Sequence, residues 1–271
     1  MLKHISRISV LILLLSIVSC ASRSVSGVRK DNNSLKLMSY NVHHCNPPSR
    51  PGVIDADAIA AVIKKENPDI VVLQEIDVNT RRSGKINQAA LLAMKAGYPS
   101  FFFARAIDYD GGQYGVAILS KYTLVNTQVH RLPTDAKAGG EPRVLATATV
   151  TLPGDKVLRI GCTHLDAEND PASRLLQIGE INRLASEITT PFLIAGDFNA
   201  TEGSPVINLL DEKFVRTCQQ CKPTFPDSDA RAIDFIAYRL PEHFSVREHR
   251  VITETYASDH FPVVATLQWR F

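Results

Sequence analysis

The feature that most constrains the fold of this 271-residue chain is a set of short, continuous runs of apolar residues. Residues 70–73 read Ile-Val-Val-Leu, and residues 192–195 read Phe-Leu-Ile-Ala. Runs of this length are too short for a buried helix and are typical of β-strands that are covered on both faces. The chain is therefore expected to build its core around sheets that lie between other layers.

Segments of alternating polarity predict further strands, and helical patterns separate them. Strands are also expected over residues 35–40, 101–104, 116–119, 124–130, 144–152, 157–163, 235–238, 244–251 and 263–269. Helices are expected from the cap Asp55 to about Glu66, over residues 87–97, over residues 171–188, and as a short helix from Ser204-Pro205. We predict one α/β domain in which two mixed, mainly antiparallel sheets pack face to face with helices outside.

The N-terminal segment has the pattern of a secretion signal. Lys3 and Arg7 precede an apolar run over residues 8–18, which is shorter than the roughly 20 residues of a membrane-spanning helix. The run ends at Ile17-Val18-Ser19-Cys20, which resembles a bacterial lipobox, where the Cys is lipidated and becomes the new N-terminus. The alternative is an ordinary signal peptide with an incidental Cys. We predict a lipoprotein signal over residues 1–19, a flexible tether over 20–34 and a folded domain over 35–271.

Lipidation at Cys20 predicts that the mature chain is anchored in the bacterial cell envelope, and Ala21 after it favours the outer membrane. Cleavage before Cys20 also removes Lys3 and Arg7, which lowers the formal net charge from +2 to zero. Nucleic-acid-binding domains usually carry a basic excess, so bulk charge gives no support to that function.

The other cysteines are Cys45, Cys162, Cys218 and Cys221. Cys218-Gln-Gln-Cys221 has the spacing of a redox motif, but it lacks the βαβ context of one, and no second pair completes a zinc site. An envelope compartment permits disulfides. We expect a local disulfide or two plain thiols here rather than a redox centre.

Polar side chains that a core does not need occur at six predicted strand ends. They are Asn41, Glu75, His164, Asp197 with Asn199, Asp234, and Asp259 with His260. Strand ends that meet at one sheet edge would bring them into one pocket. Oxygen ligands suit Mg²⁺ or Mn²⁺, while His, Asp and Asn can transfer protons and stabilise charge.

The segments around these residues resemble the ordered motifs of the endonuclease/exonuclease/phosphatase superfamily. They read Ser39-Tyr40-Asn41-Val42, Leu73-Gln74-Glu75-Ile76-Asp77, Thr163-His164-Leu165, Gly196-Asp197-Phe198-Asn199-Ala200, Ile233-Asp234-Phe235-Ile236 and Ser258-Asp259-His260-Phe261-Pro262-Val263. The resemblance runs from about Leu35 to Phe271. It implies a four-layered α/β sandwich and an Mg²⁺-dependent hydrolase of phosphoesters, with phosphodiesters expected, by in-line attack of water.

The resemblance also implies roles for individual residues. Glu75 would be the principal Mg²⁺ ligand, with Asn41 beside it and Asp259 as a second carboxylate of the metal site. Asp197 would orient or deprotonate the attacking water, and Asn199 would hold the non-bridging phosphate oxygens.

Two histidines complete the implied site. His260 would contact the scissile phosphate with its ring held by Asp234. His164 matches the second active-site His of the deoxyribonuclease and sphingomyelinase branches. It would stabilise the transition state or protonate the leaving oxygen.

Three arginines are weaker candidates for binding the substrate. Arg143 is either a phosphate contact or a surface residue at the start of a strand. Arg81 and Arg82 are either readers of a second anionic group or a solvated pair in a loop. Gly115 is expected to have a structural role at a close approach of two strands.

The substrate stays open between several classes. A nuclease in the envelope and a phosphodiesterase of phospholipid or sphingomyelin head groups are both compatible with the motifs. A non-enzymatic lipoprotein with a decayed site is disfavoured, because no member of the ligand set is missing. No partner protein is evident.

Overall fold

The computed structural model of the protein describes residues 33–226 and 230–270. These described residues belong to one compact unit. The predicted signal over residues 1–19, the lipidation site Cys20 and the tether up to residue 32 lie outside the described residues. Within the described part of the chain, none of the helices combines the length and the apolar character that crossing a membrane requires.

The first of two six-stranded sheets has the strand order β11-β12-β1-β2-β4-β3. Its strands are β1 (Ser34–Asn41), β2 (Ile70–Val78), β3 (Ser100–Tyr109), β4 (Gly112–Ser120), β11 (Phe244–Val251) and β12 (Val263–Trp269). All neighbours in it are antiparallel except β1 and β2, which run parallel. The sheet is therefore mixed and mainly antiparallel, as predicted.

The second sheet has the strand order β5-β6-β7-β8-β10-β9. Its strands are β5 (Val125–Arg131), β6 (Val144–Leu152), β7 (Lys156–His164), β8 (Phe192–Asp197), β9 (Val215–Arg216) and β10 (Asp234–Arg239). Only β7 and β8 are parallel. The short strand β9 carries no apolar run, and sequence patterning did not predict it.

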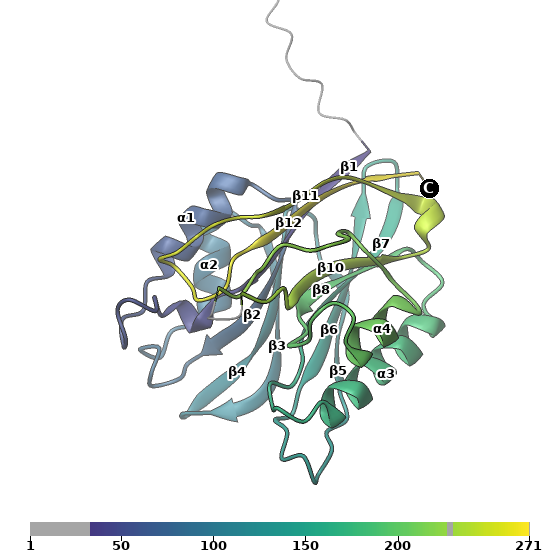
Figure 1. Cartoon of the computed structure of the whole chain (residues 1–271). Coiled ribbons are helices and arrows are strands. Elements are labelled where there is room, and N and C mark those ends of the chain that lie inside the picture. Colours follow the sequence, from purple (N-terminus) through teal and green to yellow (C-terminus); the bar gives the residue numbers. More distant parts are fainter. Residues whose placement is uncertain (1–32, 227–229, 271) are drawn as a thin grey trace, which may run out of the picture. The chain divides into compact units, whose positions relative to one another are not determined.

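Four helices cover the outer faces of the two sheets (Figure 1). Helices α1 (Ala56–Glu66) and α2 (Gln88–Ala96) pack on the first sheet, and α3 (Ala172–Glu187) and α4 (Pro205–Asp211) pack on the second. A third apolar cluster fills the space between the sheets. Helix, sheet, sheet and helix make the predicted four-layered α/β sandwich, which explains why residues 70–73 and 192–195 are apolar throughout.

Local sequence explains where the helices begin and end. The side chains of Asp55, Asn87 and Ser204 each accept a hydrogen bond from a backbone N–H in the first turn of their helix. Helix α2 ends at Gly97, which adopts a left-handed conformation with φ of 81°. These caps agree with the predicted helix boundaries.

The strand registers bring the predicted site residues together. His164 at the end of β7 is paired with Asp197 at the end of the parallel strand β8. Asp197 is in turn paired with Asp234 at the start of β10, which runs antiparallel. In the other sheet, Asn41 lies opposite Gln74, next to Glu75. The fold therefore delivers polar strand ends from both sheets to one edge of the sandwich.

Gly115 on β4 lies against the backbone of β3, and its expected structural role is confirmed. A Cβ atom on Gly115 would lie 2.0 Å from the carbonyl oxygen of Ala104 on β3. That separation is far inside van der Waals contact, and the obstructing atom belongs to the backbone.

We predict that Gly115→Ala lowers the free energy of unfolding by about 3 kcal/mol or more. Gly179→Ala in helix α3 is a matched control, since a Cβ atom there meets nothing within 4 Å. That variant should gain about 0.5–1 kcal/mol from helix propensity. Urea unfolding followed by circular dichroism measures both values. Equal stabilities of the two variants would show that the strands can separate at Gly115 without cost.

Candidate active site

The carboxylate of Asp197 is the centre of the site. It is buried, and its Oδ2 accepts a hydrogen bond of 3.1 Å from Nδ2 of Asn41. Nε2 of His164 lies 3.5 Å from the same oxygen, and Nε2 of His260 lies 3.7 Å from it. The structure thus brings three of the predicted residues around one oxygen atom of a fourth.

His260 is held from its other side by Asp234. Nδ1 of His260 lies 2.9 Å from Oδ2 of Asp234, so its N–H donates to this carboxylate. Burial lowers the pKa of His260, but the charge and the hydrogen bond of Asp234 outweigh burial and raise this pKa to about 10. His260 is therefore a cation at neutral pH that presents its Nε2–H towards Asp197.

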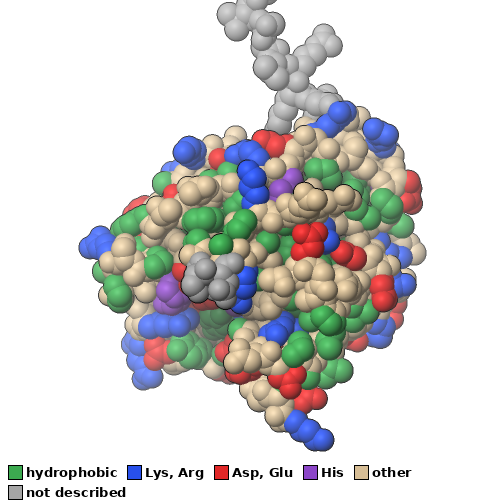
Figure 2. Space-filling view, viewed as in Figure 1, with side chains coloured by type: hydrophobic (Ala, Val, Ile, Leu, Met, Phe, Trp, Pro, Cys, Tyr) green, Lys and Arg blue, Asp and Glu red, His purple; other side chains and the backbone are tan. Residues whose placement is uncertain are grey.

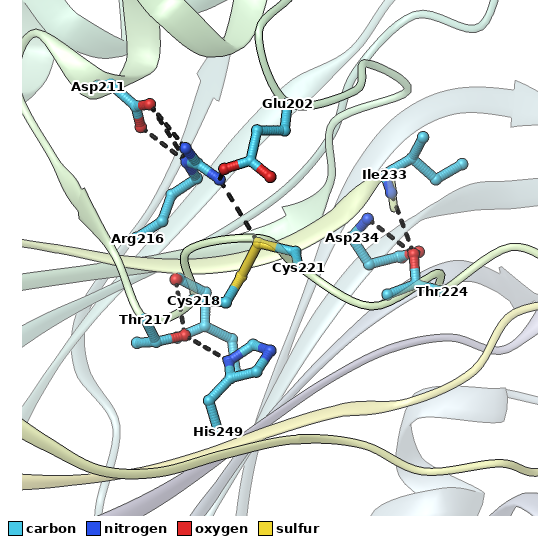
Figure 3. The surroundings of a disulfide bond; sticks show 11 residues. Glu202, Asp211, Arg216, Thr217, Cys218, Cys221, Thr224, Ile233, Asp234 and His249 are labelled. Atoms are coloured by element: carbon cyan, nitrogen blue, oxygen red, sulfur yellow. Dashed lines mark hydrogen bonds and ion pairs between the residues drawn. A yellow bond between two sulfur atoms is a disulfide. The ribbon is translucent and has the colours of Figure 1, made fainter. Parts of the chain in front are cut away.

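Thr224 fixes the Asp234 carboxylate in turn. Its hydroxyl donates to Oδ2 of Asp234 over 2.6 Å and accepts from the backbone N–H groups of Ile233 and Asp234 over 3.1 Å each (Figure 3). The ring of Phe225 also packs against the ring of His260, with centroids 4.7 Å apart. The sequence pattern did not predict the bond from Thr224 to Asp234, because this bond spans a turn whose shape the residues do not specify.

His164 is in the opposite charge state from His260. Nη1 of Arg143 lies 3.3 Å from Nδ1 of His164. Because a guanidinium can only donate, Nδ1 accepts and the ring proton lies on Nε2. Burial and then the charge of Arg143 lower the pKa of His164 well below its usual value. His164 is therefore neutral and can donate a hydrogen bond from Nε2, which favours the transition-state role over that of proton donor.

Glu75 lies on a bulge of β2 that turns its side chain towards Asn41. The register of β2 shifts between Leu73 and Ile76, and Glu75 has a φ of 59°. Nδ2 of Asn41 donates to Oε1 of Glu75 over 3.0 Å, and Nδ1 of His44 lies 3.9 Å from Oε2. Burial raises the pKa of Glu75, but the neighbouring groups, first His44 and then His164 and Asn41, outweigh burial and hold the pKa well below its usual range. Glu75 is ionised at neutral pH.

Asn199 and Asp259 flank this centre. The backbone N–H of Asn199 donates to Oδ1 of Asp197 over 2.9 Å, and its side-chain amide donates to the carbonyl oxygen of Leu165. The hydroxyl of Ser258 donates to the carbonyl oxygen of Asn41 over 2.7 Å and so holds the segment with Asp259 beside β1. Asp259 itself is half-buried.

Two groups of side chains could hold a metal ion. Glu75 offers an ionised and partly exposed carboxylate, with 22% of its side chain accessible. Asp197, Asp234 and His260 form a second group, whose ligand atoms lie within 4.8 Å of one another. In that group, however, Oδ2 of Asp234 already accepts from Thr224 and His260, although Oδ1 has no hydrogen-bond partner among the described residues.

The structure places the three candidate arginines in different surroundings. Arg143 is buried and contacts His164 and Glu141, so it belongs to the site. Arg82 is bound through two nitrogens to the buried carboxylate of Asp77, over 2.7 Å and 2.9 Å. Arg81 is exposed and pairs with Asp110.

Of the two states that the sequence left open for Cys218 and Cys221, the structure has the local disulfide (Figure 3). Nη1 of Arg216 lies 3.4 Å from the Cys221 sulfur, and this guanidinium also pairs with Glu202 and Asp211. The segment that follows the disulfide leads to Thr224. The remaining thiols of Cys45 and Cys162 are buried.

These features define a class of protein, the α/β sandwich whose strand ends carry a site for phosphoester hydrolysis. Residues 38–260 match the model of the endonuclease/exonuclease/phosphatase family. The chain belongs to this family, whose members are phosphoester hydrolases. No curated protein sequence matches the chain.

Solved structures with the same fold support this assignment. An endonuclease/exonuclease/phosphatase from Beutenbergia cavernae is 26% identical, with a TM-score of 0.74 over 88% of this chain and 72% of that chain. The human Nocturnin catalytic domain is 17% identical, with a TM-score of 0.68 over 88% and 94%. A mannosyl-6-phosphatase from Bacteroides thetaiotaomicron is 17% identical, with a TM-score of 0.65 over 88% and 100%. The last two likenesses concern the fold alone.

Proposed function

We propose that the protein is a divalent-cation-dependent hydrolase of phosphoester bonds, with phosphodiesters as its substrates. The observation that carries this proposal is the convergence of Asn41, His164 and His260 on one carboxylate oxygen of Asp197. Such an arrangement surrounds a base with donors that can face a phosphate. It supports attack by a water molecule on phosphorus.

Asp197 is the proposed base that orients and deprotonates the attacking water. Burial raises the pKa of Asp197, and the nearby charge of Asp234 raises it further. A carboxylate with a raised pKa accepts a proton more readily than an ordinary one. Asn41 and Asn199 keep this carboxylate in a single orientation through hydrogen bonds to its two oxygens.

Two side chains, His260 and His164, are proposed to stabilise the charge that develops on the phosphate. His260 presents a cationic ring, and Asp234 keeps that ring charged and correctly oriented. His164 presents a neutral Nε2–H whose position is set by Arg143. Donors that are fixed before the reaction stabilise developing charge better than mobile ones.

Mg²⁺ is the proposed cation, with Mn²⁺ as a substitute, and Glu75 is its principal ligand. Its ionised carboxylate is the oxygen donor that these metals prefer. Asp259 is proposed as a second carboxylate of the metal site. Asn41 presents its amide nitrogen to Glu75, so we assign it the role of orienting that carboxylate. When bound, the cation would neutralise negative charge on the phosphate.

We predict that Asp197→Asn and His260→Ala each lower kcat/KM for bis-p-nitrophenyl phosphate by about a hundredfold or more, because the first removes the proposed base and the second removes a cation that faces the phosphate. Chelation by EDTA should stop the wild-type reaction, and Mg²⁺ or Mn²⁺ should restore it. Asp57→Ala is the control, since this carboxylate lies on helix α1 with 80% of its side chain exposed.

Asp57→Ala should keep wild-type activity, and circular dichroism should show that all three variants are folded. Wild-type turnover by folded Asp197→Asn protein would contradict the proposed base. Turnover that is insensitive to EDTA would contradict the role of the metal.

We also propose that the protein is a lipoprotein of the bacterial outer membrane, anchored through Cys20. The sequence pattern over residues 1–20 supports this proposal. Cys20→Ser should therefore move the protein from the membrane fraction to the soluble fraction, as judged by fractionation and immunoblotting. Cys162→Ser is the control, because this thiol is buried in the folded domain. Identical membrane fractionation of the wild-type protein and Cys20→Ser would refute the anchor.

A further inference from the structure

A cavity of about 150 Å³ adjoins the carboxylate of Glu75 and has no part in the chemistry described above. Its walls come from β2 and the turn after it, from the hairpin of β3 and β4, and from the segment before β6 (Figure 1). The lining residues are Glu75, Arg82, Ile107, Tyr109, Tyr114 and Glu141. Because it lies beside the proposed metal ligand, the cavity is placed to hold the group that a phosphoester substrate carries on its phosphate.

The walls of this cavity are fixed by hydrogen bonds. Asp110, at the tip of the hairpin, accepts from Nε of Arg81 over 2.9 Å and from the backbone N–H of Arg82 over 2.6 Å. The guanidinium of Arg82 is bound on its other side to Asp77. The cavity is therefore formed before any ligand arrives, as binding sites usually are.

The charges that line the cavity disfavour an anionic occupant. Glu75 and Glu141 contribute two carboxylates. Arg82 is the cation among the six lining residues, and Asp77 already neutralises it. Glu141 is itself paired with Arg143 over 2.9 Å, so Arg82 and Arg143 both already have carboxylate partners, and a second phosphate would find no free counter-charge in either of them. Hydroxyl groups, in contrast, can donate to the carboxylate of Glu141.

The aromatic side chains favour a puckered ring over a flat base. The guanidinium of Arg82 lies 4.5 Å from the centroid of the Tyr109 ring and covers that face. The rings of Tyr109 and Tyr114 are 6.3 Å apart and inclined at 55°, so they do not form a parallel slot. Together with Ile107 they offer apolar surface to the C–H groups of a saturated ring.

We propose that this cavity binds a neutral, hydroxyl-rich six-membered ring, so that the substrates are phosphoesters of sugars or cyclitols. The proposal rests on the phosphoester hydrolysis proposed above and names its substrate class. The ring packs against the apolar surface of Tyr109, Tyr114 and Ile107, while its hydroxyl groups donate hydrogen bonds to the carboxylate of Glu141. Such a ring occurs both in soluble sugar phosphates and in the head groups of inositol lipids.

The test compares matched esters with the full-length protein and Mg²⁺. The first two substrates are the p-nitrophenyl phosphodiester of glucose through its O6 and cyclohexylmethyl p-nitrophenyl phosphate, which has the same ring size without hydroxyl groups. Thymidine 5′-(p-nitrophenyl phosphate) provides a nucleoside. We expect kcat/KM for the glucose ester to exceed that of either competitor about tenfold or more.

Tyr109→Ala should reduce the preference for glucose over the cyclohexyl ring about tenfold. Phe101→Ala is the matched control, because this aromatic residue lies on the same strand with a similar exposure, 44% against 42% for Tyr109. The preference of Phe101→Ala for glucose over the cyclohexyl ring should equal that of the wild type. The rate of hydrolysis of phosphatidylinositol vesicles, compared with that of phosphatidylcholine vesicles, identifies the source of the ring. Faster hydrolysis of phosphatidylinositol indicates a lipid head group, and equal rates indicate a soluble sugar ester.

Equal rates for the glucose and cyclohexyl esters, or a preference for the thymidine ester, would overturn the proposed ring class while phosphoester hydrolysis stands. If the wild type cleaves no ester, hydrolysis itself fails. Saturation-transfer NMR with glucose 6-phosphate and EDTA then decides the cavity separately. Binding of glucose 6-phosphate by the wild type and Phe101→Ala but not by Tyr109→Ala would support the proposed ring site. Equal binding by all three proteins, or binding by none of them, would overturn it.

Discussion

The buried carboxylate of Asp197 and its hydrogen bonds are the interaction on which the site depends. Burying a carboxylate costs free energy unless donors surround it. Here the donors come from both sheets, since Asn41 ends β1 and His164 ends β7, while the segment with His260 precedes β12. The packing of the two sheets and the geometry of the site therefore constrain each other. A change in how the sheets pack would separate Asn41 from Asp197.

The same arrangement explains why the two imidazoles differ in charge. His260 lies between the carboxylates Asp234 and Asp197, which keep it cationic despite burial. His164 is kept neutral by burial and then by the guanidinium of Arg143 beside it, which both lower its pKa. One site thus contains a fixed cation and a fixed neutral donor on either side of a single base. Over the face drawn in Figure 2, Lys and Arg side chains are interspersed with acidic and apolar ones, so local groups rather than bulk charge must select the substrate.

Much of this arrangement follows from the sequence, because short apolar runs that end in polar residues specify both the strands and their ends. Asn41, His164 and Asp197 were found in this way. The bulge at Glu75 extends β2 beyond the predicted strand, and no residue pattern marks it. The bonds from Thr224 to Asp234 and from Arg82 to Asp77 were also missed, because they join segments that meet only after the turns have formed. Helix α3 also buries polar side chains. One of them is Gln177, whose side-chain oxygen accepts a hydrogen bond from the backbone N–H of Asp166, just after β7.

The central claim is that Asp197 is kept free as a base, while the metal binds at Glu75. A crystal structure of the protein soaked in Mn²⁺, with anomalous scattering data collected to locate the ion, tests this claim most directly. We predict an anomalous peak within coordination distance of a Glu75 carboxylate oxygen, about 2.1–2.3 Å. A single peak among Asp197, Asp234 and His260, with none at Glu75, would contradict it.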